Sequence, residues 1–261
     1  MQLLKPSAVF IISVFLFSVS FAQVEPEQVQ EKAPVALKKT FLKTSLTGIA
    51  LKNYSFQIER VVSRKISFAV SLRTMPLSSI PFQKLVLKKI DENDLQTRET
   101  IESLRLSNIA ITPEMKLYLS KRGYGRGFYI SFFYRYARFK ASPLLFEVEN
   151  SPGVSRKIEF SGTFTANTGG LLFGAQWPIG KSLCLDLWLL GPHYGAGSGL
   201  FSSSPSQPLT TNEQNDLRTN LEDLDIPLTK KTISVSANAA SLKLDGPWGG
   251  IRTGLSFGFN F

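Results

Sequence analysis

Apolar residues recur at every second position in seven segments of this chain, with Thr253 as the one exception. These segments lie at 54–58, 66–72, 115–119, 128–136, 171–177, 183–189 and 251–261. Alternation with a period of two is typical of β-strands with one apolar face, because successive side chains point to opposite faces of the sheet. An eighth strand is predicted at Lys39–Leu51, where β-propensity is high although the alternation slips. We therefore predict an all-β protein with eight strands.

The opposite face of these strands carries a few charged residues among Tyr, Ser and Gly. In a soluble sandwich or a lipocalin-like barrel that face would be solvated and rich in Lys and Glu. A sparse mixture of both signs instead suits a narrow interior, in which buried charges must pair. We predict a lumen charge network formed by Glu59, Arg73, Glu114, Lys116, Arg135, Asp186 and Arg252.

The connections between the predicted strands alternate in length. Short links lie near 63–65, 121–127 and 178–182, and longer ones at 74–107, 140–156 and 191–249; the first link, LKNY, is short and departs from the rule. Short turns at one rim and longer loops at the other are typical of outer-membrane barrels, with the turns in the periplasm and the loops outside. An even number of strands places both termini on the periplasmic side. We predict an eight-stranded antiparallel transmembrane β-barrel.

Two segments in the long loops have the spacing of short amphipathic helices. Leu95, Ile101 and Leu104 fall on one stripe within 91–106, and Leu217, Leu221 and Leu224 do so within 211–226. These helices either cap the mouth of the barrel or form a surface for an extracellular partner. The candidate partner surface is therefore made of the extracellular loops 74–107 and 191–249.

The N-terminal residues have the pattern of a secretory signal peptide. Lys5 precedes an apolar run from Ala8 to Phe17, and small residues follow at Ser20 and Ala22. A transmembrane anchor would need about 20 apolar residues, so cleavage after Ala22 is the better interpretation. The predicted organisation is a signal peptide at 1–22, an N-terminal periplasmic segment at 23–38 and an outer-membrane barrel at 39–261.

Charge and cysteine content narrow the possible partners. The formal net charge is +10, which is consistent with binding to nucleic acid, binding to acidic lipid, or no specific partner. Predicted export and the lack of a recognition motif argue against nucleic acid, so we expect outer-membrane lipids, including lipopolysaccharide, as the electrostatic partner. Cys184 is the single cysteine, which excludes an internal disulfide.

Several segments together resemble an outer-membrane β-barrel family of unknown function from Gram-negative bacteria, with the architecture of small OmpA/OmpX-like barrels. The matching segments are YSFQIERVVSRKISFAVSL, PEMKLYL, GFYISFFYRY, GLLFGAQW, LCLDLWLLGPHYG and the terminal aromatic strand. The resemblance implies integral insertion in the outer membrane of a Gram-negative bacterium. It also implies recognition by the barrel assembly machinery. The C-terminal signal of such barrels is resembled by Leu255, Phe257, Phe259 and Phe261.

Three functions remain open. The first is a structural or surface-interaction role for a monomer without an open diffusion pore, because eight strands leave an interior filled by its own side chains. The second is a lipid A-modifying enzyme with His193 as a weak catalytic candidate beside Ser198 or Ser202, although no spacing marks a triad. The third is a small channel. We expect no cofactor and no metal, because neither a ligand cluster nor a phosphate-binding glycine loop occurs.

Overall fold

The computed structural model describes residues 39–91, 94–151 and 154–261, and most of them lie in strands. The strands are β1 Thr40–Ser45, β2 Tyr54–Val61, β3 Ile66–Ser79, β4 Arg105–Tyr118, β5 Gly127–Ser151, β6 Val154–Ile179, β7 Leu183–Ser203, β8 Lys230–Val235 and β9 Ala240–Asn260. The helices are α1 Leu46–Ala50, α2 Gln83–Leu87, α3 Leu95–Ser103 and α4 Thr211–Glu222. The predicted signal peptide and the predicted segment 23–38 lie outside the described residues.

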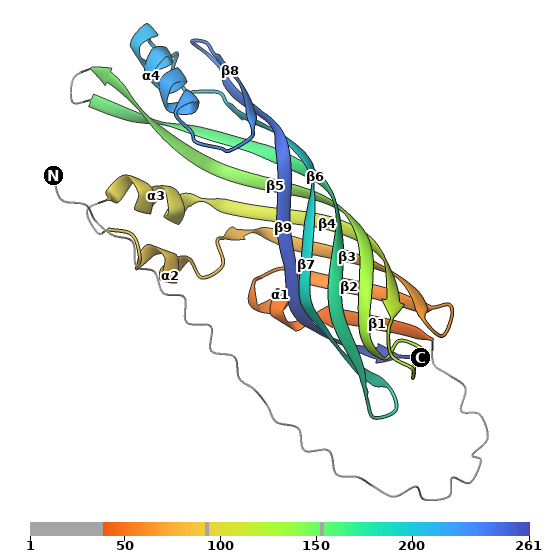
Figure 1. The fold of residues 1–261 in the computed structure, drawn as a ribbon. Coiled ribbons are helices and arrows are strands. Elements are labelled where there is room, and N and C mark those ends of the chain that lie inside the picture. The colour runs from red at the N-terminus through yellow and green to blue at the C-terminus, as the bar shows by residue number, and fades with distance from the viewer. Residues whose placement is uncertain (1–38, 92–93, 152–153) are drawn as a thin grey trace, which may run out of the picture. The chain divides into compact units, whose positions relative to one another are not determined.

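The sheet closes on itself as a ring of eight strands. Neighbours follow the order β1 to β7, then β9, and β9 pairs back with β1 (Figure 1). Every pairing is antiparallel, and β8 adds a short strand beside β9 outside the ring. The ring is sealed at its end by a hydrogen bond of 3.0 Å from the Thr40 amide to the Phe261 carbonyl oxygen. The predicted all-β ring of eight antiparallel strands is confirmed.

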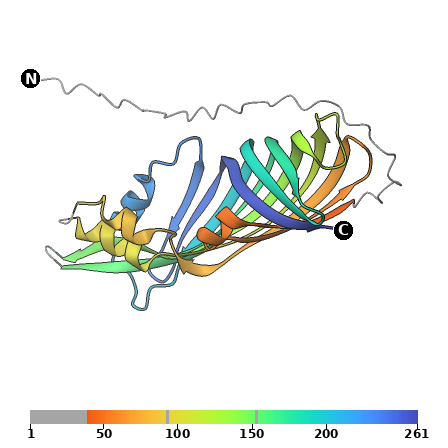
Figure 2. The ribbon, with the colours of Figure 1, turned by 90° about the horizontal axis from the view of Figure 1, so that it is seen from below.

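The two ends of the ring differ in their connections. One end of the ring carries the short links, at 62–65, 119–126 and 180–182, and also holds Lys39 and Phe261. We call it the short-turn end. Figure 2 shows the yellow helices α2 and α3 and the light blue α4 at the opposite end, which we call the helix-bearing end. The predicted alternation of connection lengths is therefore present, with both ends of the barrel domain at one rim.

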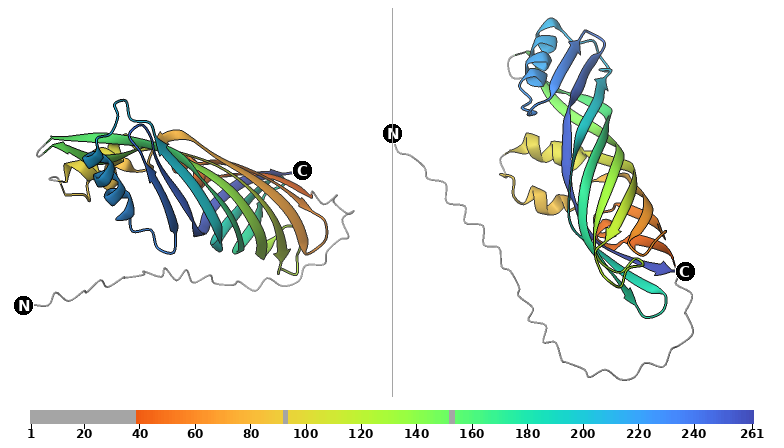
Figure 3. Two further views of the ribbon diagram at one scale, coloured as in Figure 1. Left: turned by 90° about the horizontal axis from the view of Figure 1, so that it is seen from above. Right: turned by 45° about the vertical axis from the view of Figure 1, so that its right-hand side comes forward.

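The predicted residue boundaries of the three longer loops were wrong. Residues 140–156 are mainly strand, because β5 and β6 continue as a hairpin beyond the ring (Figure 3). The predicted loop 191–249 contains the second half of β7, the first half of β9 and all of β8. The predicted loop 74–107 likewise begins and ends in strand. On β6 the alternation reverses in the extension beyond the ring, because Lys157 and Glu159 are exposed while Ile158 and Phe160 are buried, and the hydrogen-bonded ladder continues.

The helix α4 closes a separate apolar core on the projecting strands. Leu217 and Leu221 are fully buried there against Phe160, Phe201 and other residues of β5, β6, β7 and β9. Both predicted amphipathic helices are present, as α3 and α4, whereas α1 and α2 were not predicted. None of the helices in the described ranges is long and apolar enough to cross a membrane.

The first predicted strand is correct only in its first half. β1 ends at Ser45, whose side chain accepts a hydrogen bond of 3.0 Å from the Gly48 amide and so starts α1. The alternation slips in this segment because Phe41 points into the ring and packs against Val61 and Cys184. The remaining segments keep the predicted alternation, with polar residues buried inside and apolar residues exposed outside.

Candidate functional site

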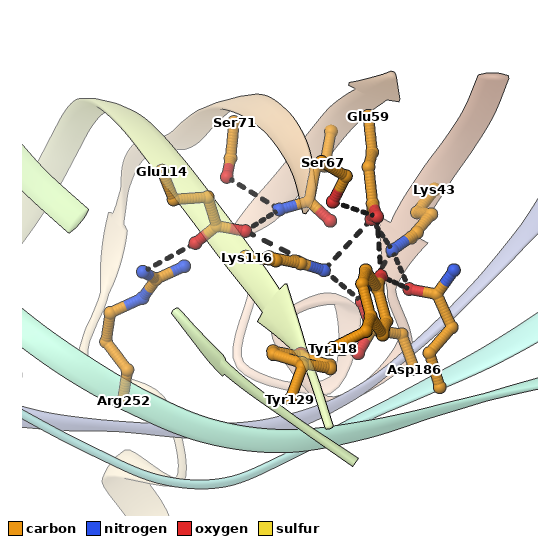
Figure 4. Close-up of polar contacts among 12 residues, drawn as sticks. Lys43, Glu59, Ser67, Ser71, Glu114, Lys116, Tyr118, Tyr129, Asp186 and Arg252 are labelled. Carbon is orange, nitrogen blue, oxygen red and sulfur yellow. Dashed lines mark hydrogen bonds and ion pairs between the residues drawn. The ribbon is translucent and has the colours of Figure 1, made fainter. Parts of the chain in front are cut away.

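The interior of the ring holds a group of fully buried charged side chains from four strands. Lys43 on β1 lies with its Nζ 2.5 Å from Glu59 Oε2 and 2.6 Å from Asp186 Oδ2. Lys116 on β4 lies with its Nζ 3.0 Å from the same Glu59 oxygen and 2.8 Å from the same Asp186 oxygen. These two lysines and two carboxylates therefore alternate around a closed square (Figure 4). None of the four side chains is exposed to solvent.

Hydroxyl groups satisfy the remaining carboxylate oxygens. The Tyr118 hydroxyl donates to Glu59 Oε1 over 2.5 Å, and Ser67 donates to the same oxygen over 2.6 Å. The Tyr129 hydroxyl donates to Asp186 Oδ1 over 2.6 Å. Every oxygen of both carboxylates thus accepts hydrogen bonds, which is the condition under which buried charge is tolerated.

A second ion pair lies beside this square, toward the helix-bearing end. Arg252 Nη1 is 3.2 Å from Glu114 Oε2, and the guanidinium lies over the rings of Phe133 and Trp188 at 4.4 Å and 4.8 Å. Glu114 Oε1 lies 3.9 Å from Lys116 Nζ, which links the pair to the square. We call Lys43, Glu59, Glu114, Lys116, Asp186 and Arg252 the ionic plug; its three carboxylates face three cations.

The strand alternation explains how residues far apart in sequence meet in this plug. Each of the six side chains occupies an inward position on its strand. Glu114 and Arg252 come from β4 and β9, which lie on opposite sides of the ring, yet they are 3.2 Å apart, so the interior is narrow enough to be spanned by two side chains. The arrangement can neutralise charge and close the lumen at this level. It offers no side chain that is free to act as a nucleophile or base.

The structure brings together five of the seven predicted network residues. Glu59, Glu114, Lys116, Asp186 and Arg252 meet in the plug. Arg73 and Arg135 also point into the ring, but neither forms an ion pair within the described ranges.

Lys43 takes their place, and sequence reasoning missed it. The signal was present, because Lys43 stands two residues from Phe41 and two from Ser45, on the inward face of β1. The apolar Phe41 on that face concealed the pattern.

His193 lies inside the ring on β7 instead of in a loop. It lines a cavity with Arg73 and Arg135, and the described residues of that lining include no carboxylate. Ser198 and Ser202 are an odd number of residues from His193 along the strand, and both are exposed. Within the described ranges, His193 is therefore not brought together with Ser198 or Ser202 and an acid. Among the described residues no group of His, Cys, Asp and Glu could hold a metal ion.

Three residues of the predicted assembly signal, Leu255, Phe257 and Phe259, lie on outward positions of β9, and the fourth, Phe261, directly follows the strand. Phe259 and Phe261 are exposed, and Leu255 and Phe257 are half-buried. The Phe257 and Phe259 rings contact each other edge to face at 6.0 Å.

No family model, no curated protein and no solved structure matches this chain. The functional conclusion therefore depends on the residues and their geometry.

Proposed function

We propose that this protein is an integral outer-membrane β-barrel of a Gram-negative bacterium, with a closed lumen and a structural or surface-interaction role. The observation that carries the proposal is the inverted distribution of side chains. Outward Phe56 and Phe128 are 60% and 59% exposed, whereas inward Glu59 and Asp186 are 0% exposed. Soluble monomers rarely expose large continuous apolar surfaces. Lipid hydrocarbon around the barrel would remove the unfavourable free energy of exposing these apolar side chains to water.

The height of the apolar surface supports the same proposal. On β5 the outward residues are apolar or aromatic from Phe128 to Tyr136, and they become charged at Arg138 and Lys140. That run covers about nine positions, which matches the 9–11 residues that a tilted strand needs to cross the bilayer core. The projecting parts of β5 and β6 would then lie in water.

Aromatic residues mark both edges of the apolar surface. Tyr134 and Tyr194 both pair with Gly169, so they lie at one level toward the helix-bearing end. Trp177, Phe259 and Phe261 are exposed near the short-turn end. Aromatic girdles at the two interfaces are characteristic of outer-membrane barrels. The short-turn end would face the periplasm and the helix-bearing end the exterior, where lipopolysaccharide is the surrounding lipid.

The ionic plug supports a closed lumen over the channel alternative. Fully buried side chains span the ring at its level, and Tyr118, Tyr129 and Gln176 fill the space around them. The proposed role then rests on the surface that projects from the helix-bearing end. There α4 is held by its own apolar core, so it presents a formed surface to an extracellular partner.

Two measurements test this proposal. Density-gradient fractionation followed by alkaline carbonate washing is expected to leave the protein in the outer-membrane pellet. Release into the wash would contradict membrane insertion. In planar bilayers the purified protein is expected to show no stable conductance of porin size, and a steady open pore would contradict the closed lumen while leaving insertion intact.

A further inference from the structure

A cavity of about 360 Å³ lies next to the ionic plug, toward the helix-bearing end. Arg73 on β3, Arg135 on β5, His193 on β7 and Arg252 on β9 line it from different strands. Polar residues around α1, including Ser45, Thr47 and Asn53, complete the lining. The cavity is thus surrounded by positive charge on inward positions.

The positive charge in this cavity is not balanced by a carboxylate of the described residues. The three carboxylates of the ionic plug already face three cations, and none of the described residues that line the cavity is acidic. Arg73 and Arg135 form no ion pair within the part of the chain that the structure describes. Arg135 is nevertheless only 8% exposed. Two guanidinium groups are therefore held close together with no carboxylate partner among the residues that the structure describes.

Two further polar atoms of the lining have no hydrogen-bond partner among the described residues. Arg252 Nε is buried and unpaired, although Nη1 of the same guanidinium binds Glu114. His193 Nδ1 is also buried and unpaired. Burying such groups without partners is costly, so a ligand that satisfied them would be stabilised.

We propose that this cavity is a binding site for a phosphate group carried as a monoester or as free phosphate. Guanidinium forks match the oxygens of phosphate in a bidentate manner. Two uncompensated positive charges match the roughly −1.5 to −2 charge of a phosphate monoester near neutral pH. Arg73 and Arg135 are the ligand-binding residues, and Arg252, fixed by Glu114 and two aromatic rings, forms the floor.

The phosphate can reach this site by two routes, which correspond to two sources. The pairing of β1 with β9 stops at Ser45 and Ser256, and that of β2 with β3 stops at Tyr54 and Thr74. Beyond these residues no strand of the described chain joins β3 to β9. A soluble phosphate ester would enter from the helix-bearing end, whereas a lipid phosphate would enter from the side.

The test uses the full-length protein in detergent and two probes, inorganic phosphate and lipid A in mixed micelles. Titration calorimetry compares the wild type with Arg73→Gln/Arg135→Gln. The matched control is Arg122→Gln/Arg126→Gln, which removes the same charge from the exposed 119–126 turn at the other end. Sodium chloride at equal ionic strength controls for general screening. Near-ultraviolet circular dichroism checks that each variant is folded.

We expect saturable binding of at least one probe and a loss of affinity of about tenfold or more in the Arg73/Arg135 variant, as for charge-assisted hydrogen bonds. The control variant should bind like the wild type, and Arg73→Lys/Arg135→Lys should retain an intermediate affinity because the charge remains without the fork. Saturation by inorganic phosphate identifies a soluble source, and saturation by lipid A alone identifies a lipid source. Binding of neither probe, or equal binding by the Gln variant, would overturn the proposal. The phosphate titration does not depend on membrane insertion, so its failure is distinguishable from failure of the proposed function.

Discussion

Replacing Lys43 by Met removes one of the two cations at the centre of the ionic plug. Its Nζ donates to Glu59, Asp186 and Gln176 over 2.5–2.6 Å, and the side chain is fully buried. Hydrogen bonds to charged groups contribute about 1.5–3 kcal/mol each, but their sum overstates the effect because removal also relieves the desolvation of the lysine. Breaking a buried pair by removing one partner costs about 3–5 kcal/mol. We expect Lys43→Met to lower the free energy of unfolding by that amount.

The assay is urea-induced unfolding in lipid vesicles, followed by tryptophan fluorescence. Lys181→Met in the exposed 180–182 turn is the matched control and should change the unfolding free energy by less than about 0.5 kcal/mol. In Lys43→Met/Asp186→Asn the loss should be smaller than the sum of the two single losses by about 0.5–3 kcal/mol, because charge balance is restored. If Lys43→Met costs no more than the control, the plug is not a dry, mutually dependent network and the reasoning fails.

Three further predictions concern the outer face, the projecting core and the chain end. Val70 lies on an outward position within the apolar surface. Val70→Arg should lower the free energy of unfolding in vesicles by about 2–4 kcal/mol, and a decrease below about 0.5 kcal/mol would indicate that this face lies in water. Burial raises the pKa of Glu213, but hydrogen bonds from Thr210 and the nearby Arg156 outweigh it, so the pKa lies below its usual range. The stabilisation is therefore present above the ordinary carboxyl pKa of about 4.3 and is lost as the pH falls through the folded-state pKa. Glu213→Gln should speed hydrogen exchange of the α4 amides at pH 7 and leave their exchange rates unchanged in acid. An effect of the same size at both pH values would contradict a lowered pKa of Glu213. Deleting Phe261 should lower the amount of inserted protein more than the stability of the finished barrel; normal outer-membrane levels on immunoblots would count against an assembly signal.

The sequence was most informative where one face of a strand is apolar over its whole length. Segments such as 66–72 and 128–136 alternate cleanly, so their strands and inward residues could be predicted. The eight-stranded ring followed from the count of such segments and from the alternation of short and long links. Beyond the apolar surface this signal disappears, and the long β5–β6 hairpin was interpreted as a loop.

Glycines added to that error on β7. Gly195 and Gly197 look like loop residues in the sequence, but a Cβ at Gly195 would overlap the backbone of Asn167 on β6. These positions are glycine because neighbouring groups approach them closely. Local sequence does not distinguish this requirement from flexibility.

The pairing inside the ring could be predicted only in part. Alternation identifies which charged residues point inward, and that placed Glu59, Asp186 and Lys116 correctly. Which cation meets which carboxylate depends on strand register across the whole ring, which no local pattern encodes. Arg73 and Arg135 therefore appeared to be plug residues, whereas they line the neighbouring cavity.

The decisive measurement for a closed barrel in a membrane is migration on a denaturing gel with and without heating. Protein extracted from membranes in detergent should migrate as a compact species when unheated and shift when boiled, because the closed ring of β1 to β7 and β9 resists the denaturing detergent at room temperature. Lys43→Met should shift at a lower temperature than the wild type. A single position at all temperatures, together with extraction in the absence of detergent, would contradict the proposed membrane barrel.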